Sequence, residues 1–209
     1  MSRILIVFMS ILFHTHLDAQ SLRGEYYLNG PPELASGFLF TKEGRFDFFF
    51  IYGAVDRVAS GSYTIDSNIL RLKSDKIPGH DFNVLLESRT GNKYSIIIQD
   101  ENTLLLRNIV CLYYIDSTEY VAFSDEQGII TIDLPSVDRI YLLHELFPDI
   151  PSLIKDEKNG NNYFEVEIMN TLPQVSFQGI EFTIEENTLS CLPNYLFPYE
   201  GIEYVKKKN

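Results

Sequence analysis

The stretch GFLFTKEGRFDFFFIYGAVDRVASGSYTIDSNILRLK, residues 37–73, decides the fold class. Runs rich in aromatic and β-branched residues alternate in it with short turns at Lys42-Glu43-Gly44 and Asp66-Ser67-Asn68. Glycine, asparagine and aspartate permit the tight reversals that hairpins need, and no helical period competes with the period of two. The stretch therefore predicts an antiparallel β meander with strands at 37–41, 45–52, 61–65 and 69–73.

The segment 45–52, RFDFFFIY, is apolar on both faces of the strand it predicts. Alternation places one set of side chains on one face and a second set on the other: Phe46, Phe48, Phe50 and Tyr52 against Asp47, Phe49 and Ile51. A face in water should carry polar residues along its length. We therefore predict that the first set forms a core, and that Phe49 and Ile51 are covered by a second module or a bound partner. A strand buried on both sides within its own small barrel would show the same pattern.

The residues on either side of this meander suggest where the first module begins and ends. Residues 24–28 predict a first strand, which Pro31-Pro32 interrupts. Between residues 73 and 93, Pro78-Gly79 and Gly91-Asn92 flank a short strand at 82–87, and the composition shifts from aromatic to aliphatic. We expect a first module over residues 20–82 and a second over 83–209, joined by a loop with few crossing contacts.

The second module reads as a series of short strands, typical of a β-sandwich, at 94–99, 106–115, 120–123, 128–134, 139–143 and 163–169. One segment fits two structures. Residues 136–147 match a strand, and they also match a Ser-capped helix with Val137, Ile140, Leu143 and Phe147 on one side. We prefer the strand, so the expected fold class is all-β.

Residues 94–168 resemble the carboxypeptidase regulatory-like, or transthyretin-like, β-sandwich modules. The turn Ser124-Asp125-Glu126-Gln127-Gly128 stands where those modules carry a T-D-x-x-G turn, and a strand at 129–134 and Pro135 follow it. Where such modules have a Gly-Tyr pair after the next strand, this chain has Leu146-Phe147-Pro148. The resemblance implies an antiparallel sandwich and transfers no catalytic residue.

Residues 24–74 resemble a small lipocalin-like meander. The recurring elements are a Gly-x-Tyr start, a Gly-x-Phe-x-Phe hairpin and a Gly-x-Tyr strand, here at Gly24 and Tyr26, Gly44 to Phe48, and Gly61 and Tyr63. An N-terminal leader ending in Ala-Gln, followed by these two modules, is a combination that resembles exported proteins of Bacteroidota. Such a resemblance implies a binding or scaffolding role.

The first nineteen residues have the three parts of a secretory signal peptide. Arg3 supplies a positive n-region, residues 4–13 are apolar apart from Ser10, and cleavage is expected after Ala19. The apolar run is about half the ~20 residues needed to span a bilayer. We expect export to the periplasm or the cell exterior, with no transmembrane segment in the mature chain. In such an oxidising compartment Cys111 and Cys191 form a possible disulfide, and a buried free thiol is the alternative for Cys111.

The composition bounds the function classes. Seventeen basic and twenty-nine acidic residues give a net charge of −12, which argues against nucleic acid as a partner. No Gly-rich phosphate loop, His-Glu-x-x-His, Cys-x-x-Cys or Gly-x-Ser-x-Gly motif follows the leader. We therefore expect no cofactor, no metal site and no catalytic residue. After processing His80 and His144 remain, and a lone histidine is usually structural.

The most distinctive polar spot is Asp56-Arg57, within GAVDRVASG at 53–61. Arg57 could act as a recognition group at the mouth of the sheet, since its planar fork grips a carboxylate. Alternatively, Asp56 and Arg57 form a hairpin tip with an ordinary ion pair. The preferred function is an exported, non-catalytic binding or scaffolding factor of the cell envelope with a protein or glycan partner. A lipocalin-like carrier of a small apolar ligand is the second hypothesis, and an extracellular hydrolase the third.

Overall fold

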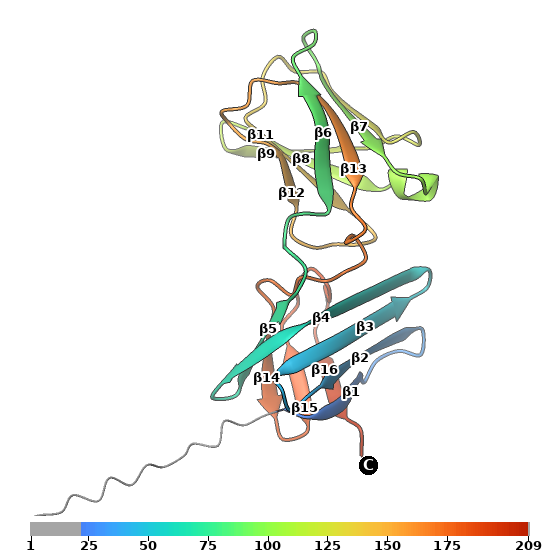
Figure 1. Ribbon diagram of the computed structural model, residues 1–209, viewed down its shortest axis with the longest axis vertical. Helices are drawn as coiled ribbons and strands as arrows, with labels where there is room; N and C mark the ends of the chain where they lie inside the picture. The colour runs from blue at the N-terminus through green and yellow to red at the C-terminus, as the bar shows by residue number, and fades with distance from the viewer. Residues whose placement is uncertain (1–21, 209) are drawn as a thin grey trace, which may run out of the picture.

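The computed structural model describes residues 22–208, and these residues form strands, one short 3-10 turn at Thr103–Leu106 and no α-helix. Figure 1 shows two β bodies stacked along the long axis, a barrel below and a sandwich above. The all-β fold class expected from the sequence is therefore confirmed. The predicted signal peptide, residues 1–19, lies outside the described residues. Within those residues no helix is long and apolar enough to cross a membrane.

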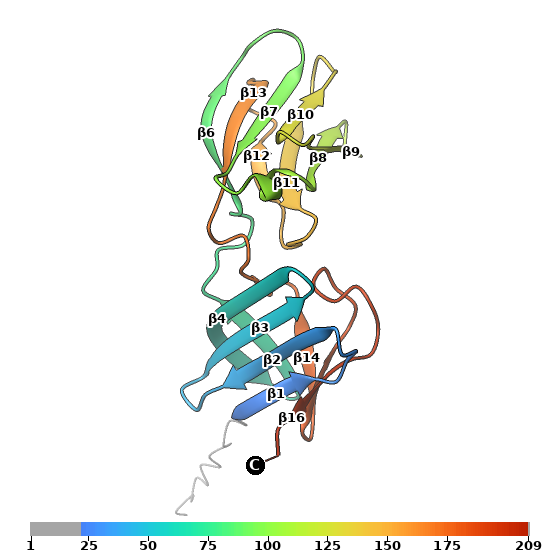
Figure 2. The same ribbon diagram turned by 90° about the vertical axis from the view of Figure 1, so that its right-hand side faces the viewer.

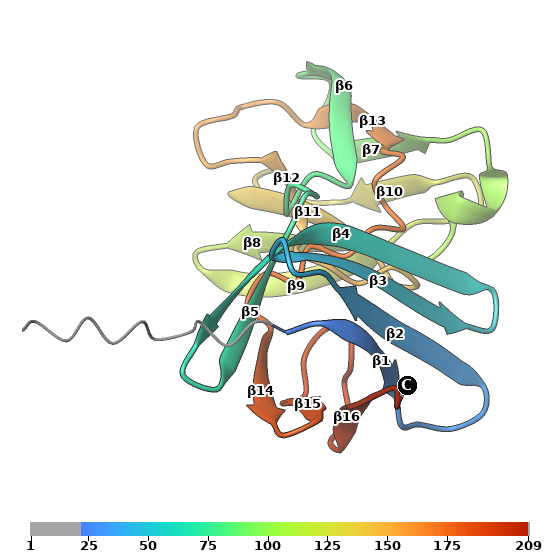
Figure 3. The ribbon, with the colours of Figure 1, turned by 60° about the horizontal axis from the view of Figure 1, so that its bottom comes forward.

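The lower body is a closed barrel in which every pair of neighbours is antiparallel (Figure 3). Its strands, in order around the barrel, are β1 Gly24–Leu28, β2 Leu34–Phe40, β3 Arg45–Tyr52, β4 Val55–Asp66, β5 Ile69–Ser74, β14 Glu181–Glu185, β15 Thr188–Cys191 and β16 Ile202–Lys206. The order is up-and-down except for one interruption between β5 and β14. There the chain leaves to build the whole upper body and then returns.

The C-terminal part of the chain belongs to the barrel, which corrects the expected division at residue 82. We had assigned everything after that residue to the second module, yet β14 pairs with β5 and β16 pairs with β1. The meander β1–β5 has too few strands to close on itself around a core, and β14–β16 complete the ring. The sandwich is thus an insertion into a barrel whose two parts are distant in sequence.

The upper body consists of two sheets of four strands, ordered β10-β7-β13-β6 and β12-β11-β8-β9. Its strands are β6 Phe82–Ser88, β7 Tyr94–Gln99, β8 Ile109–Ile115, β9 Thr118–Phe123, β10 Ile129–Ile132, β11 Arg139–His144, β12 Ser152–Lys155 and β13 Tyr163–Ile168. The segment that fitted either a helix or a strand is the strand β11. Strand β13 is parallel to β7 and antiparallel to β6, and the other neighbours are antiparallel.

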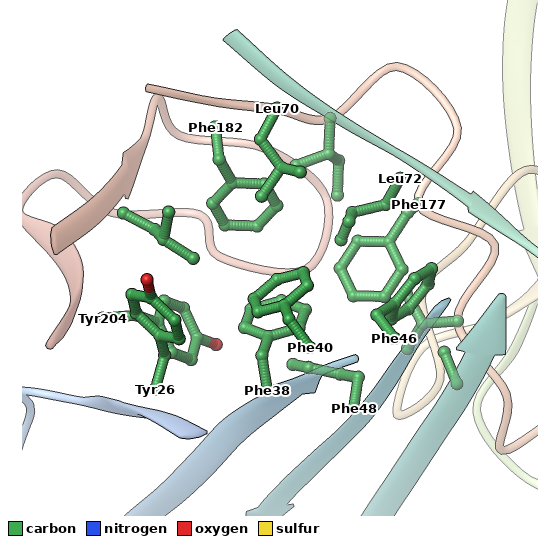
Figure 4. Packing of buried hydrophobic residues seen from close by; sticks show 14 of the residues in the cluster. Tyr26, Phe38, Phe40, Phe46, Phe48, Leu70, Leu72, Phe177, Phe182 and Tyr204 are labelled. Carbon is green, nitrogen blue, oxygen red and sulfur yellow. The ribbon is translucent and has the colours of Figure 1, made fainter. Parts of the chain in front are cut away.

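Aromatic rings fill the interior of the barrel (Figure 4). The ring centroid of Phe38 lies 4.8 Å from those of both Phe48 and Tyr204. Phe177, which precedes β14, adds a ring from the returning linker, 4.9 Å from Phe48 and 5.7 Å from Phe46. These side chains are at most a few per cent exposed, so they form a packed core inside the barrel.

The side chains on the inner face of strand β3 are largely buried in the core, as predicted, but those on its outer face are not covered as predicted. Phe46 and Phe48 are buried and Phe50 packs at the edge of the core, whereas Tyr52 is 57% exposed. On the outer face Ile51 is 43% exposed and Phe49 half-buried, so the prediction that the second module covers them is wrong.

A glycine explains how the barrel itself accommodates the outer aromatic ring of β3. Phe49 lies beside Tyr27, with ring centroids 6.4 Å apart, and Gly37 is on the strand between them. A Cβ at Gly37 would lie 2.7 Å from Cε1 of Phe49 and 3.1 Å from Cδ1 of Tyr27. The missing side chain therefore lets the two rings approach each other across β2. A partner that covers Ile51 stays a prediction.

Cys111 and Cys191 are both free thiols, so the possible disulfide does not form. Cys111 lies in β8 within the sandwich core, and Cys191 lies in β15 of the barrel. Burial raises the pKa of the Cys111 thiol to about 12 and that of Cys191 to about 11. A single bridge would have to join the two bodies, and the insertion topology places these strands in separate cores.

Candidate functional site at the barrel mouth

The sandwich sits over one end of the barrel, which we call the barrel mouth (Figure 2). Two linkers cross there, residues 75–81 after β5 and residues 169–180 before β14. The upper half of β4 extends beyond its pairing with β5, and the returning linker pairs with it instead. Val58 N donates to Pro173 O at 3.2 Å, and Val175 N donates to Val58 O at 2.9 Å.

A buried lysine joins the linkers to the sandwich. The Nζ atom of Lys76 lies 2.8 Å from Asp81 Oδ1 and 3.0 Å from Asp149 Oδ2, and it donates to Gln174 O at 2.8 Å. The side chain of Lys76 is fully buried. Removing such a charge from water is costly unless it is paired, and here two carboxylates and a carbonyl surround it. The expected loop with few crossing contacts is therefore wrong, because the first linker is fixed by ion pairs.

Asp149, in the loop between β11 and β12, is the centre of this cluster. Burial acts to raise the pKa of its carboxyl, but the charge of Lys76 and hydrogen bonds from Ser176 and the Ile150 N–H outweigh burial and lower the pKa. Ser176 donates from Oγ at 2.5 Å to Oδ1 and from its backbone N at 2.8 Å to Oδ2. Asp149 is thus held as an anion that binds both linkers at once.

The pKa of Asp81 is shifted in the opposite direction to that of Asp149. Burial raises its pKa to about 6, although hydrogen bonding and the charge of Lys76 oppose the rise. Its Oδ1 atom is within ion-pair distance of Lys76 but accepts no well-directed hydrogen bond within residues 22–208. The backbone N–H groups of Asp81 and Phe82 donate to Ser152 Oγ, at 2.9 and 3.3 Å, which orients the start of β6.

Arg57, the recognition residue proposed from the sequence, points into the barrel mouth and is 1% exposed. Its Nη1 donates to Pro148 O at 2.6 Å and its Nη2 to Gln174 O at 3.0 Å. Nη2 also lies 3.7 Å from Asp149 Oδ2, while Nε has no partner among the described residues. Burial lowers the pKa of the guanidinium, and the charge of Asp149 opposes this shift. The fork of Arg57 therefore binds backbone carbonyls of the sandwich and the returning linker.

Asp56 is separated from Arg57 by the alternation of β4. It is exposed on the outer face opposite Ile51, and within the described chain Arg57 pairs with Asp149 instead. The hairpin between β3 and β4 turns at Gly53 and Ala54, and Gly53 has a φ of 61°. The alternative of a hairpin-tip ion pair is therefore wrong. Phe49 and Ile51 also lie on the outer face, so of the four proposed residues only Arg57 belongs to the mouth.

A pocket of about 440 Å³ opens at the mouth beside Arg57. Three barrel segments and one sandwich loop line it: Pro31 and Leu34; Phe50, Tyr52, Val55 and Arg57; Tyr195, Leu196, Pro198 and Tyr199; and Glu145, Leu146 and Pro148 of the sandwich. Tyr52 is 57% exposed and Tyr199 43% exposed. The hydroxyl of Tyr195 is 3.3 Å from Ser176 Oγ, which connects this pocket, the mouth pocket, to the ionic cluster.

His80 and His144, the two histidines among the described residues, offer no catalytic partner at the mouth. His80 is exposed on the first linker. His144 is buried at the end of β11, where its Nδ1 accepts a hydrogen bond from Leu146 N at 3.2 Å and burial lowers its pKa. In the part of the chain that the structure describes, no group of three or more His, Cys, Asp or Glu side chains has metal-binding geometry.

Sequence reasoning missed the cluster formed by Lys76, Asp81, Asp149 and Ser176. These residues are spread over a hundred positions and lie in no recognisable motif. The pocket residues 195–199 were missed as well, because we expected the C-terminal segment to belong to the other module.

The chain has no significant match among protein-family models, curated proteins or solved structures. An eight-stranded closed barrel is compatible with the lipocalin-like resemblance at the level of architecture.

Proposed function

We propose that this protein is an exported, non-catalytic binding or scaffolding factor of the cell envelope, and that its partner docks at the mouth pocket. One observation carries the proposal: the pocket has walls from both domains, and a buried ionic cluster fixes those domains relative to each other. A site assembled in this way is preorganised, so little conformational entropy is lost when it is filled. The lipocalin-like and transthyretin-like resemblances fit such a role.

The chemistry of the lining indicates what the pocket would hold. Its exposed aromatic groups are Tyr52 and Tyr199, and its proline rings are Pro31, Pro148 and Pro198. Tyrosine offers an apolar ring with a polar hydroxyl, and such residues dominate the binding energy of many interfaces. The partner we propose is a protein that inserts an apolar side chain, or a glycan that stacks a sugar ring on these tyrosines.

A small-molecule carrier is the second candidate, and the size of the pocket favours it. Ligand pockets commonly measure about 300–1,000 Å³, and 440 Å³ falls within that range. Since aromatic rings fill the barrel interior, the ligand would lie at the mouth and not inside the barrel as in an open carrier.

The hydrolase hypothesis has weaker support. The two clustered carboxylates, Asp81 and Asp149, are both less than 10% exposed and are occupied by Lys76 and by hydrogen bonds from Ser176. A general acid or base must reach a proton on the substrate. These groups instead hold the linkers, which is why we propose a non-catalytic role.

Paired tyrosine variants test the proposal. Tyr52→Ala and Tyr199→Ala remove the exposed rings of the mouth pocket, and Tyr27→Ala removes a comparably exposed ring, 42%, on the outer wall of the barrel. Glycan arrays and affinity capture from envelope extracts identify the partner, and titration then measures its affinity. We expect the mouth variants to weaken binding at least about tenfold and Tyr27→Ala to leave it unchanged. Equal affinity in all variants would contradict a site at the mouth.

A further inference from the structure

Two of the three rows on the outer face of the sheet β12-β11-β8-β9 are apolar where polar residues would be expected. Pairing across the sheet defines two rows of outward side chains: Phe123, Val110 and Leu143 in one, and Val121, Leu112, Tyr141 and Leu153 in the other. Phe123 is 62% exposed, Leu153 51% and Val121 48%. None of the seven side chains in these rows is charged. We call these seven residues the apolar sheet face.

The other sheet of the sandwich shows what an ordinary solvated face looks like. Its outward rows contain Thr131, Ser95, Tyr163 and Ser88, then Ile129, Ile97, Glu165 and Leu86, then Gln99, Glu167 and Asn83. Polar or charged residues occur in every row, as expected for a sheet with one face in water. The apolar sheet face lacks this pattern, although both sheets belong to the same domain.

The apolar sheet face is on the outer side of its sheet, away from the sheet that contains β6 and β13. Strands are about 4.8 Å apart and same-face residues about 6.8 Å apart along a strand, so the seven residues cover roughly 230 Å² in projection. Contiguous apolar patches of a few hundred Å² are the largest that typical monomeric proteins expose, and they are often functional. Two such faces would bury an area below that of standard specific interfaces, so we expect a weak association.

A row of polar residues at the border indicates the occupant. Glu119 of β9 and Arg139 of β11 flank Tyr114 of β8, one on each side and in register. A two-fold axis parallel to β8 would therefore place Glu119 of each copy opposite Arg139 of the other. Within one chain, Glu119 accepts a hydrogen bond from the Tyr114 hydroxyl. Arg139 stacks on Tyr114 with its Cζ 4.7 Å from the ring centroid and lies 3.6 Å from Glu157, and its Nε makes no hydrogen bond among the described residues.

We propose that the apolar sheet face binds the same face of a second copy of this chain. The homodimer packs two sheets face to face, with the apolar rows in the centre and two Glu119–Arg139 pairs at the border. Such an isologous interface is self-complementary by symmetry.

Sedimentation velocity of the mature protein tests this proposal. We expect the mass to shift from monomer to dimer over a range of roughly 1–200 μM, as befits a small interface. The double variant V121E/F123E introduces charges at two exposed positions, so the fold is retained and the protein stays monomeric throughout. The matched control Leu85→Glu, at a position 50% exposed on the opposite sheet, leaves dimerisation unchanged. A wild-type protein that is monomeric at 200 μM would overturn the proposal.

Charge reversal tests the symmetry of the interface separately. Glu119→Arg alone and Arg139→Glu alone each juxtapose like charges and should weaken the dimer severalfold. The double variant E119R/R139E restores opposite charges and should recover dimerisation. If the double variant is as weak as either single variant, the proposed two-fold axis is wrong.

Discussion

The Nζ atom of Lys76 lies 3.0 Å from Oδ2 of Asp149, and this contact joins the first linker to a loop of the sandwich. Asp149 also accepts hydrogen bonds from Ser176 on the second linker. The carboxylate of Asp149 thus binds both linkers. Swinging the sandwich away from the barrel would leave buried charges unpaired, so we expect the two domains to move as one unit.

Asp149→Asn should destabilise the protein by about 3–5 kcal/mol, because it leaves Lys76 and Arg57 buried with less compensating charge. Asp75→Asn is the matched control, since Asp75 forms an exposed pair with Arg45 and the side chains are 61% and 48% exposed. The control should cost at most about 1 kcal/mol. Urea unfolding measures both variants. If Asp149→Asn lowers the free energy of unfolding by no more than about 1 kcal/mol, like the control, the cluster is not important for stability.

Asp81→Asn should change how stability depends on pH. The pKa of Asp81 is raised to about 6 from 3.8, so the native state holds this proton more tightly than the unfolded state. The free energy of unfolding therefore falls by roughly 3 kcal/mol as the pH rises from about 4 to 6 and Asp81 loses this proton. Asparagine removes that term, so the variant should gain stability relative to the wild type between pH 4 and pH 7.5. A constant difference across this range would refute the raised pKa.

Phe48→Ala should destabilise the barrel by about 3–5 kcal/mol, because it removes a ring packed between Phe38 and Phe177. Ile51→Ala on the same strand is the control. Ile51 is 43% exposed, and its truncation should cost under about 1 kcal/mol. Thermal and denaturant unfolding distinguish the two, and equal effects would contradict the assignment of faces on β3.

Gly37→Ala should destabilise the barrel by about 1–3 kcal/mol, since a Cβ would collide with Phe49 Cε1 at 2.7 Å and crowd Tyr26 O at 3.0 Å. Gly160→Ala, where a Cβ meets nothing within 4 Å, serves as the control. We expect the control to be near neutral. A neutral Gly37→Ala would show that the rings of Tyr27 and Phe49 do not require the glycine.

Strands marked by a local sequence pattern were predicted well, and strands that depend on pairing with distant residues were predicted poorly. The bounds of β1, β3 and β7 agree with the sequence prediction because alternation and flanking turns are encoded within a few residues. The four-residue strands β12 and β15, as well as β14 and β16, were missed. Closure of the barrel depends on pairs such as Arg71 with Glu181, and no short window of sequence contains both residues.

The candidate site was predictable only in part. Arg57 stood out because it forms, with Asp56, a charged pair beside a predicted hairpin turn. Its contacts with Pro148, Asp149 and Gln174 exist only after the sandwich has been inserted and the chain has returned to the barrel. For the same reason, no local pattern marked Lys76 as part of a site.

Site-specific photocrosslinking tests the central claim, that a partner docks at the mouth pocket. A photoreactive phenylalanine analogue replaces Tyr52, which is 57% exposed in the pocket wall, or Tyr27, which is 42% exposed on the outer wall. The protein is irradiated in the living cell that produces it. We expect position 52 to give a discrete crosslinked product that is lost with Tyr199→Ala, and position 27 to give none. Crosslinks of equal yield from both positions, or from position 27 alone, would contradict the proposed site.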